Sequence, residues 1–412
     1  MSRLTMSLKF AAAAALPLLL VGVVVQRDID TRWDQMAVHL DQLGAERRAR
    51  DTEREAAYGD TVDGPAWPHL EFALNEMKRV WDTMPIHNFD AVEAKTPEER
   101  AERDALLAEL EPAFEALHRG AHARDASTGV DLSDGSLEDA GALPMAWYLS
   151  NFAVAKAQSQ IERGEDLAGV DTLLDTMQLG RDLVTASSLV EEMMGLALLA
   201  NEYLLQWLAG GGADQMSDEA KERWLDGMDR IHASIPAQSP AMAGELERFL
   251  RGLRRTVEPE ASQVSWMSNQ DWHGPSRGPG LAYQFSWRAA AADLMDRAPD
   301  LVRRGEAAYG LSGVATMEAL ESLQAEMEAD DNPLIGHFGR YLVITGRSRI
   351  YCMARFDFLR HALAVHLGLD VELPGDPWGR GVRVEVDGDR VRVWTPSGEG
   401  DGALDVTVGM AK

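Results

Sequence analysis

The chain has few of the residues that build covalent cross-links and basic binding faces. Only one of its 412 residues, Cys352, is a cysteine, which excludes an internal disulfide and any zinc or iron–sulfur site built from cysteines. Basic residues are also in deficit, because 40 lysines and arginines stand against 67 aspartates and glutamates, for a formal net charge of −27. Nucleic-acid binding needs a basic face. The composition therefore argues against a nucleic-acid partner.

Several motifs of well-known catalytic folds are missing as well. The chain contains no P-loop, no dinucleotide-binding G-x-G-x-x-G and no H-E-x-x-H. Glu191 and Glu192 are a candidate pair of general acid and base. They also stand in the first turn of an expected helix that begins with a Ser188–Glu191 capping box. Carboxylates in a first turn stabilise the N-terminus of a helix without any catalytic role. The sequence therefore favours a protein without enzymatic activity.

The N-terminus predicts a membrane anchor. Arg3 and Lys9 precede an apolar run over residues 10–25. As a helix, this run is about 24 Å long. The run ends in Val-Val-Val-Gln rather than in the small residues of a cleavage site, so an uncleaved single span is favoured over a cleaved signal peptide. In both alternatives the positive end stays in the cytoplasm. We expect a single-pass protein of the bacterial inner membrane with its bulk in the periplasm.

The residues after the anchor (1–26) have the periodicity of a mainly α-helical protein. Residues 27–130 predict an amphipathic stalk helix over 27–59, a helix over 67–84, a capped helix from Thr96 to about 122 and a loop over 123–136. Residues 131–370 predict an irregular array of αα-hairpins. Its helices are expected over 143–162, 167–186, 189–208, 216–235, 241–256, 283–306, 314–329 and 333–367.

A long connection over residues 257–282 interrupts this array. It is rich in glycine, proline and serine and contains Trp266 and Trp272. A loop of this length in a compact protein is usually functional or disordered. One interpretation is an aromatic loop that binds a protein partner, and the other is that both tryptophans fold back onto the helices.

Residues 371–412 change to the alternating pattern of β-strands and predict a small β cap. A turn at residues 388–389 pairs Asp387 with Arg390 and Glu385 with Arg392, which favours it over a turn at 387–388 that sets two arginines opposite each other. The alternating residues 404, 406 and 408 predict a third strand. Such a small sheet needs a helix to pack on, and the helix ending near 367 is the expected one.

The same end of the chain contains a candidate calcium loop. Glu399, Asp401 and Asp405 stand at short spacing among glycines, and carboxylates with backbone oxygens are the ligands that Ca²⁺ prefers. The alternative is an acidic turn between strands that holds no ion. The sequence predicts no cofactor, and calcium in this loop is the one alternative considered.

A second candidate metal site lies in the helix that ends near residue 122. Glu115, His118 and His122 share one helical face, and Glu-x-x-His is half of the ligand set of di-metal carboxylate bundles. The second half is missing, and Asp229-x-x-His232 is the nearest substitute. The alternative is that the two histidines face solvent.

Two resemblances rest on particular stretches of the sequence. "DPWG" (376–379), the predicted hairpin and "WTPSGEGDG" (394–402) resemble the C-terminal end of type II secretion pseudopilins, which can hold calcium there. The prepilin processing site of that family does not precede the apolar run. The N-terminal span, residues 142–184, residues 332–342 and "RFDFLRHALAVHLGL" resemble uncharacterised membrane-anchored helical proteins of planctomycetes and myxobacteria. That resemblance implies an anchor, a helical array and a small β end in this order, and no established activity.

These observations together predict an envelope-anchored, extracytoplasmic scaffold or protein-interaction protein with a protein partner in the cell envelope. The alternative is a periplasmic hydrolase or metal-dependent enzyme, in which carboxylates from several helices converge. Residues of such a site need not be neighbours in the sequence. The two alternatives are distinguished by whether ionisable side chains meet in the fold.

Overall fold

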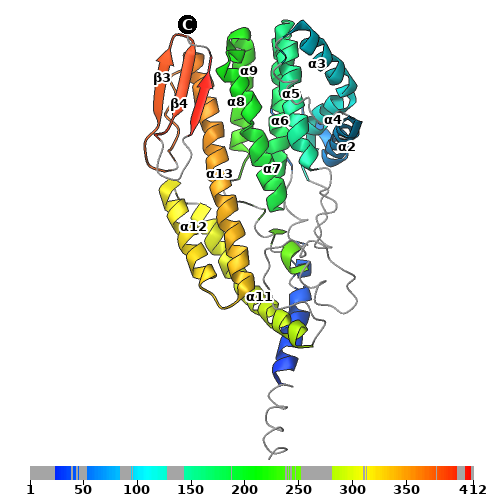
Figure 1. Cartoon of the computed structure of the whole chain (residues 1–412), viewed down its shortest axis with the longest axis vertical. Helices are drawn as coiled ribbons and strands as arrows, with labels where there is room; N and C mark the ends of the chain where they lie inside the picture. Colours follow the sequence, from blue (N-terminus) through cyan, green and yellow to red (C-terminus); the bar gives the residue numbers. More distant parts are fainter. Residues whose placement is uncertain are drawn as a thin grey trace, which may run out of the picture.

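The protein is mainly α-helical, with a three-stranded antiparallel sheet near its C-terminus (Figure 1). The structure is a computed structural model and describes residues 24–83, 94–127, 143–251, 281–376, 378–396 and 404–409, with short gaps inside several of these ranges. No helix within these residues is long and apolar enough to cross a membrane. The apolar run predicted to be the anchor lies almost entirely outside them.

The helices are α2 (Trp67–Thr83), α3 (Pro97–Glu109), α4 (Glu111–His122), α5 (Pro144–Glu162), α6 (Asp166–Val184), α7 (Leu189–Leu199), α8 (Glu202–Ala209), α9 (Asp218–Ala233), α11 (Leu281–Tyr309), α12 (Gly313–Glu328) and α13 (Pro333–His366). The strands are β1 (Val62–Pro65), β2 (Ala123–Asp125), β3 (Arg383–Asp387), β4 (Arg390–Trp394) and β5 (Asp405–Val408), and η3 (Gly212–Gln215) is a 3₁₀ turn.

Helix starts were predicted well from their caps, whereas two predicted helices are broken. Thr96 and Ser188 both form the expected capping boxes. The helix predicted from Thr96 to residue 122 ends before Leu110 and restarts as α4 with a proline in its first turn. Proline has no backbone N–H and cannot donate a hydrogen bond to a carbonyl of the preceding turn, so it is tolerated at the start of a helix and not in its interior. The helix predicted over 189–208 breaks at Asn201, whose side chain caps α8 by accepting the Leu204 N–H.

The amphipathic helix predicted over residues 27–59 is shorter than expected, and its apolar face is covered by another helix. A helix does cover residues 24–38, but Trp33 and Met36 on its apolar face are 4% and 1% exposed and pack in a core shared with α11. Arg288 of α11 contacts Asp30 as well. Residues 62–65 form β1, which pairs in parallel with β2 inside the predicted loop over 123–136. Both strands are too short to show an alternating pattern.

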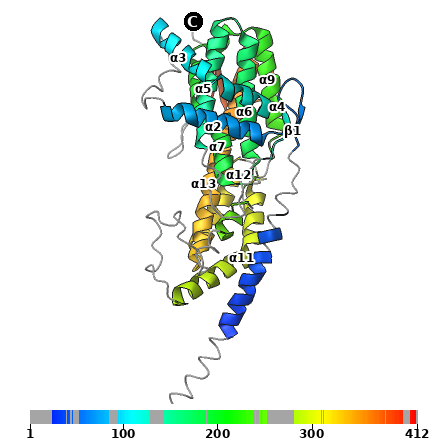
Figure 2. The same ribbon diagram turned by 90° about the vertical axis from the view of Figure 1, so that its right-hand side faces the viewer.

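Helix α6 is the centre of the upper bundle (Figures 1 and 2). It packs against α4, α5, α7 and α9. Its crossing with α7 is close, because a Cβ atom on Gly195 would lie 2.3 Å from the carbonyl oxygen of Gly180. Fourteen of its residues are buried, including the polar Asp175, Gln178 and Asp182. Polar groups placed this deep need partners within the protein.

The C-terminal sheet has the predicted register. Asp387 pairs with Arg390 and Glu385 with Arg392, as a turn at residues 388–389 requires. Strand β5 is the third strand and pairs with β4. The sheet buries Val391 and Val393 against α13, which is the helix expected to cover it. Burying these side chains contributes to the stability of the cap.

Candidate metal centre

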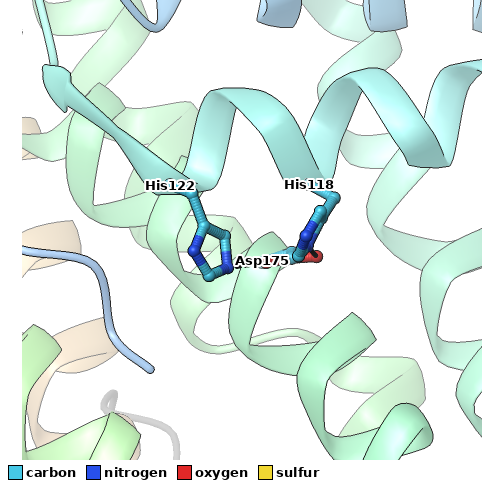
Figure 3. A group of neighbouring side chains, drawn as sticks. All are labelled: His118, His122 and Asp175. Atoms are coloured by element: carbon cyan, nitrogen blue, oxygen red, sulfur yellow. Dashed lines mark hydrogen bonds and ion pairs between the residues drawn. The ribbon is translucent and has the colours of Figure 1, made fainter. Parts of the chain in front are cut away.

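Helices α4 and α6 lie side by side and bring His118, His122 and Asp175 together (Figure 3). The two histidines are four residues apart on α4 and therefore share one of its faces. Asp175 comes from the middle of α6. One ligand atom from each side chain lies within 4.8 Å of the others. This is the one such group of three metal-ligating side chains in the part of the chain that the structure describes.

The distances between these side chains fit a shared cation. His118 Nδ1 lies 3.0 Å from Asp175 Oδ2, and His122 Nε2 lies 3.7 Å from Asp175 Oδ1. Ligand atoms around a tetrahedral zinc ion, with bonds of about 2.0–2.1 Å, are about 3.3 Å apart. The two separations lie on either side of that value, so small side-chain rotations suffice to place an ion between them.

His122 presents a lone pair to the centre of this cluster. Its Nδ1 lies 3.0 Å from the carbonyl oxygen of Asp60, which can only accept, so Nδ1 carries the proton. Its Nε2 is then an acceptor, and this atom is buried without a hydrogen-bond partner. The residue as a whole is only 9% exposed. At metal sites, the ligating histidine usually donates its other ring N–H to such an oxygen, which fixes the tautomer.

Asp175 is a buried carboxylate that lies beside both histidines. Its side chain is 8% exposed, and its two oxygens lie 3.0 Å from His118 Nδ1 and 3.7 Å from His122 Nε2. The Tyr58 hydroxyl donates to Asp175 Oδ1 at 2.7 Å. The hydrogen bond to Asp175 raises the pKa of His118, and burial followed by the Asp175 charge raises the pKa of Tyr58. The raised pKa of His118 favours its protonated form beside this carboxylate.

The segment before β1 covers the inner side of the cluster. Arg54 holds this segment in place. It forms a buried ion pair with Asp182 at 2.8 Å and donates hydrogen bonds to the carbonyls at the end of α4. Gly59 has φ of +62°, and a Cβ there would lie 3.2 Å from the ring of His122. Glycine therefore allows the chain both to turn and to approach the histidine.

A second charged pair lies on α6 one turn before Asp175. Asp171 accepts two hydrogen bonds from Arg223 of α9, at 2.6 and 2.9 Å. The Arg223 guanidinium also lies 5.0 Å from the centre of the Tyr58 ring. Burial raises the pKa of Asp171, and Arg223 opposes that shift. This pair therefore contacts Tyr58 as well as joining α6 to α9.

The other members of the proposed di-metal set do not join the cluster. Glu115 extends toward Arg119 at 3.8 Å and its side chain is 62% exposed. His232 pairs with Asp357 of α13, and Asp229 pairs with Arg360. The alternative that both histidines face solvent is wrong for His122, which is buried, while the side chain of His118 is 53% exposed.

The remaining candidate residues have other positions. Asp405 accepts hydrogen bonds from Arg392 at 3.0 and 3.1 Å, whereas Glu399 and Asp401 lie outside the described residues, so the calcium loop stays a prediction. Trp266 and Trp272 also lie outside the described residues. The prediction that they bind a partner is therefore not tested.

Glu191 and Glu192 do not act as a pair. Glu191 closes the capping box with Ser188. Glu192 forms a buried ion pair with Arg349 of α13 and accepts a hydrogen bond from Ser239. Burial raises the pKa of Glu192, although Arg349 opposes this. Each carboxylate thus has its own structural partner, and the two are not arranged as general acid and base.

Sequence reasoning missed Asp175, the residue that completes the cluster. A signal was present, because Asp171, Asp175, Gln178 and Asp182 recur at spacings of four, three and four on α6. The spacing places them on one helical face, beside the apolar stripe of the same helix. A polar stripe next to the buried face indicates polar partners from neighbouring elements.

Comparison with known proteins adds no functional assignment. The chain matches no family model, and no curated protein or solved structure matches it significantly. The chemistry of the site therefore rests on its own geometry: two imidazoles and one carboxylate, which together can ligate a transition-metal ion.

Proposed function

We propose that the protein binds a divalent transition-metal ion, with zinc the favoured one, through His118, His122 and Asp175. The observation that carries the proposal is the buried Nε2 of His122, which has no hydrogen-bond partner and faces Asp175 Oδ1 at 3.7 Å. Two acceptors that face each other in a buried place are unfavourable without a cation between them. A metal ion satisfies both.

The ligand types favour zinc over calcium or magnesium. Imidazole nitrogen binds zinc, copper, iron and nickel well, whereas calcium and magnesium prefer oxygen ligands. Two histidines with one carboxylate is a ligand set of catalytic zinc sites, and a water molecule fills the fourth position there. This ligand set supports the alternative of a metal-dependent enzyme that the sequence left open. The site has one carboxylate and two histidines, where several converging carboxylates were expected from the sequence. The periplasmic location, the anchor over residues 10–25 and the αα-hairpin array belong to the same proposal.

Zinc titration of the full chain by calorimetry tests the proposal. We expect one zinc ion per chain, and at least about a hundredfold weaker binding in His118→Gln and Asp175→Asn, since each removes a ligand. His232→Gln is the matched control, because this histidine pairs with Asp357 at 2.9 Å outside the cluster, and it should bind zinc as the unchanged protein does. His118 is half-exposed, so His118→Gln should fold, and circular dichroism checks this. Equal affinity in His118→Gln and His232→Gln would refute the proposal.

A second candidate function is the protein interaction expected from the sequence. It is favoured by an aromatic group at the surface of α2, α5 and α8, in which Trp81 stacks on Tyr148 at 4.1 Å and Trp147 lies 6.1 Å from Tyr203. Trp147 is 36% exposed. Aromatic residues of this kind are enriched in interfaces. Affinity capture from the native membrane should recover a specific partner with the unchanged protein and lose it with Trp147→Ser. Recovery of the same set of proteins with both would contradict the interaction.

A further inference from the structure

The three side chains of the metal centre leave one side of the cluster open. His122 and Asp175 have 11% and 8% of their side-chain surface exposed, whereas His118 has 53% exposed. The inner side is covered by the segment that carries Tyr58 and Asp60. Within the described part of the chain, the exposed side of the cluster is therefore the His118 side, where a ligand from solvent can reach a bound ion.

Among the described residues, Tyr58 has a hydroxyl that contacts both Asp175 and His118, so it is a candidate for a fourth ligand. Its hydroxyl donates to Asp175 Oδ1 at 2.7 Å and lies 3.1 Å from His118 Nδ1. A neutral phenol is a poor metal ligand, and ligation requires the phenolate. The hydroxyl is also already used as a donor that orients the carboxylate, which is the role of outer-shell groups at metal sites. Tyr58 is accordingly a positioning residue.

The charges around the cluster favour an anion at the open position. A divalent ion with two neutral imidazoles and one carboxylate keeps one net positive charge. The neighbouring charges cancel in pairs, because Asp171 is bound by Arg223 at 2.6 Å and Arg119 lies 3.8 Å from Glu115. A monoanion at the open position neutralises the centre. The bound metal ion is the largest local charge and attracts such an anion.

We propose that the ion bound by His118, His122 and Asp175 carries an exchangeable water on the His118 side, and that a small monoanion such as a carboxylate replaces this water. The inference rests on the proposed metal binding. It assigns the centre to the open class of zinc sites, in which three protein ligands leave room for a substrate, rather than to the closed class with four protein ligands. The ligand class is a small carboxylate or another monoanion that a single open position accepts.

Cobalt(II) substitution of the full chain, with sodium azide as the probe, tests this inference. Cobalt gives visible d–d bands that report its coordination, and azide should change these bands with saturation when it replaces the water. Tyr58→Phe should bind cobalt about 10–100-fold more weakly, because its hydroxyl orients Asp175. At saturating cobalt it should still show the azide response, because the hydroxyl is not a ligand. Asp175→Asn is the control for cobalt bound elsewhere, and it should lose both the bands and the response.

The outcomes separate this inference from the metal binding on which it rests. If cobalt does not bind, the proposed function fails and the inference fails with it. If cobalt binds but azide leaves the bands unchanged, the metal site stands and the open position is refuted. If azide acts only on Tyr58→Phe, the phenol is the fourth ligand and the site is closed. An azide response that survives in Asp175→Asn also overturns the inference.

Discussion

The crossing of α6 and α7 makes a sharp prediction about Gly195. A Cβ atom at this position would lie 2.3 Å from the carbonyl oxygen of Gly180 and 2.6 Å from the backbone nitrogen of Val184. Ordinary contact begins about 1 Å farther out. The obstructing atoms belong to the backbone, so a side-chain rotation does not relieve the clash. Gly195→Ala therefore requires the two helices to separate.

The size of the effect follows from two opposing contributions to the free energy of unfolding. Overpacking of a well-packed core costs about 1–3 kcal/mol, and the rigid backbone at Gly195 places the substitution at the upper end. Replacing glycine by alanine in a helix stabilises the folded protein by up to about 1 kcal/mol, because alanine has the higher helix propensity. We expect a net loss of about 2 kcal/mol, which lowers the melting temperature by about 2–3 °C for a chain of this size.

Gly336 of α13 provides the matched control. The nearest atom to a Cβ there is the carbonyl oxygen of Met327 at 3.3 Å, so Gly336→Ala requires only a slight adjustment and should change stability by less than about 1 kcal/mol. Thermal and urea unfolding followed by circular dichroism measure both variants. If Gly195→Ala is as stable as Gly336→Ala, α6 and α7 do not cross as closely as described.

Two further predictions concern buried groups. Arg54→Met leaves Asp182 without its main counter-ion in a pair whose side chains are both 1% exposed, and it should cost about 3–5 kcal/mol in urea unfolding. Arg79→Met, which removes an exposed ion-pairing arginine, should cost less than about 1 kcal/mol, and similar losses in both variants would contradict the burial of Arg54. Burial raises the pKa of Cys352 to about 11. Roughly one thiol in a thousand is therefore ionised at pH 8, and the thiolate is the form that reacts. Iodoacetamide should alkylate the folded protein about a hundredfold more slowly than the unfolded chain. Equal alkylation rates would show that the thiol is not buried.

Local interactions were predicted from the sequence because they depend on neighbouring residues. The capping boxes at Thr96 and Ser188 need only four consecutive positions. The hairpin register depends on which charges face each other across one short turn, and Arg390 and Arg392 were placed correctly in this way. The packing of the sheet on α13 also followed, since a small sheet needs a covering helix.

The features that could not be predicted from the sequence depend on interactions between distant segments of the chain. Asn201 ends a predicted helix because its side chain donates to Ser150 and Asn151 of α5, fifty residues earlier. Likewise, the two histidines on α4 were recognised as sharing a face, but their partner Asp175 lies on another helix. Periodicity shows that a helical face is polar, and it does not show which helix will lie against that face.

The central claim is that His118, His122 and Asp175 together hold one metal ion. Anomalous diffraction at the zinc absorption edge, from crystals of the zinc-loaded protein, tests it most directly. We predict a single strong peak in the cluster, at about 2.0–2.1 Å from the Nε2 atom of His122 and at a similar distance from a carboxylate oxygen of Asp175. Density that shows these side chains well ordered, with no anomalous peak between them at saturating zinc, would contradict the claim.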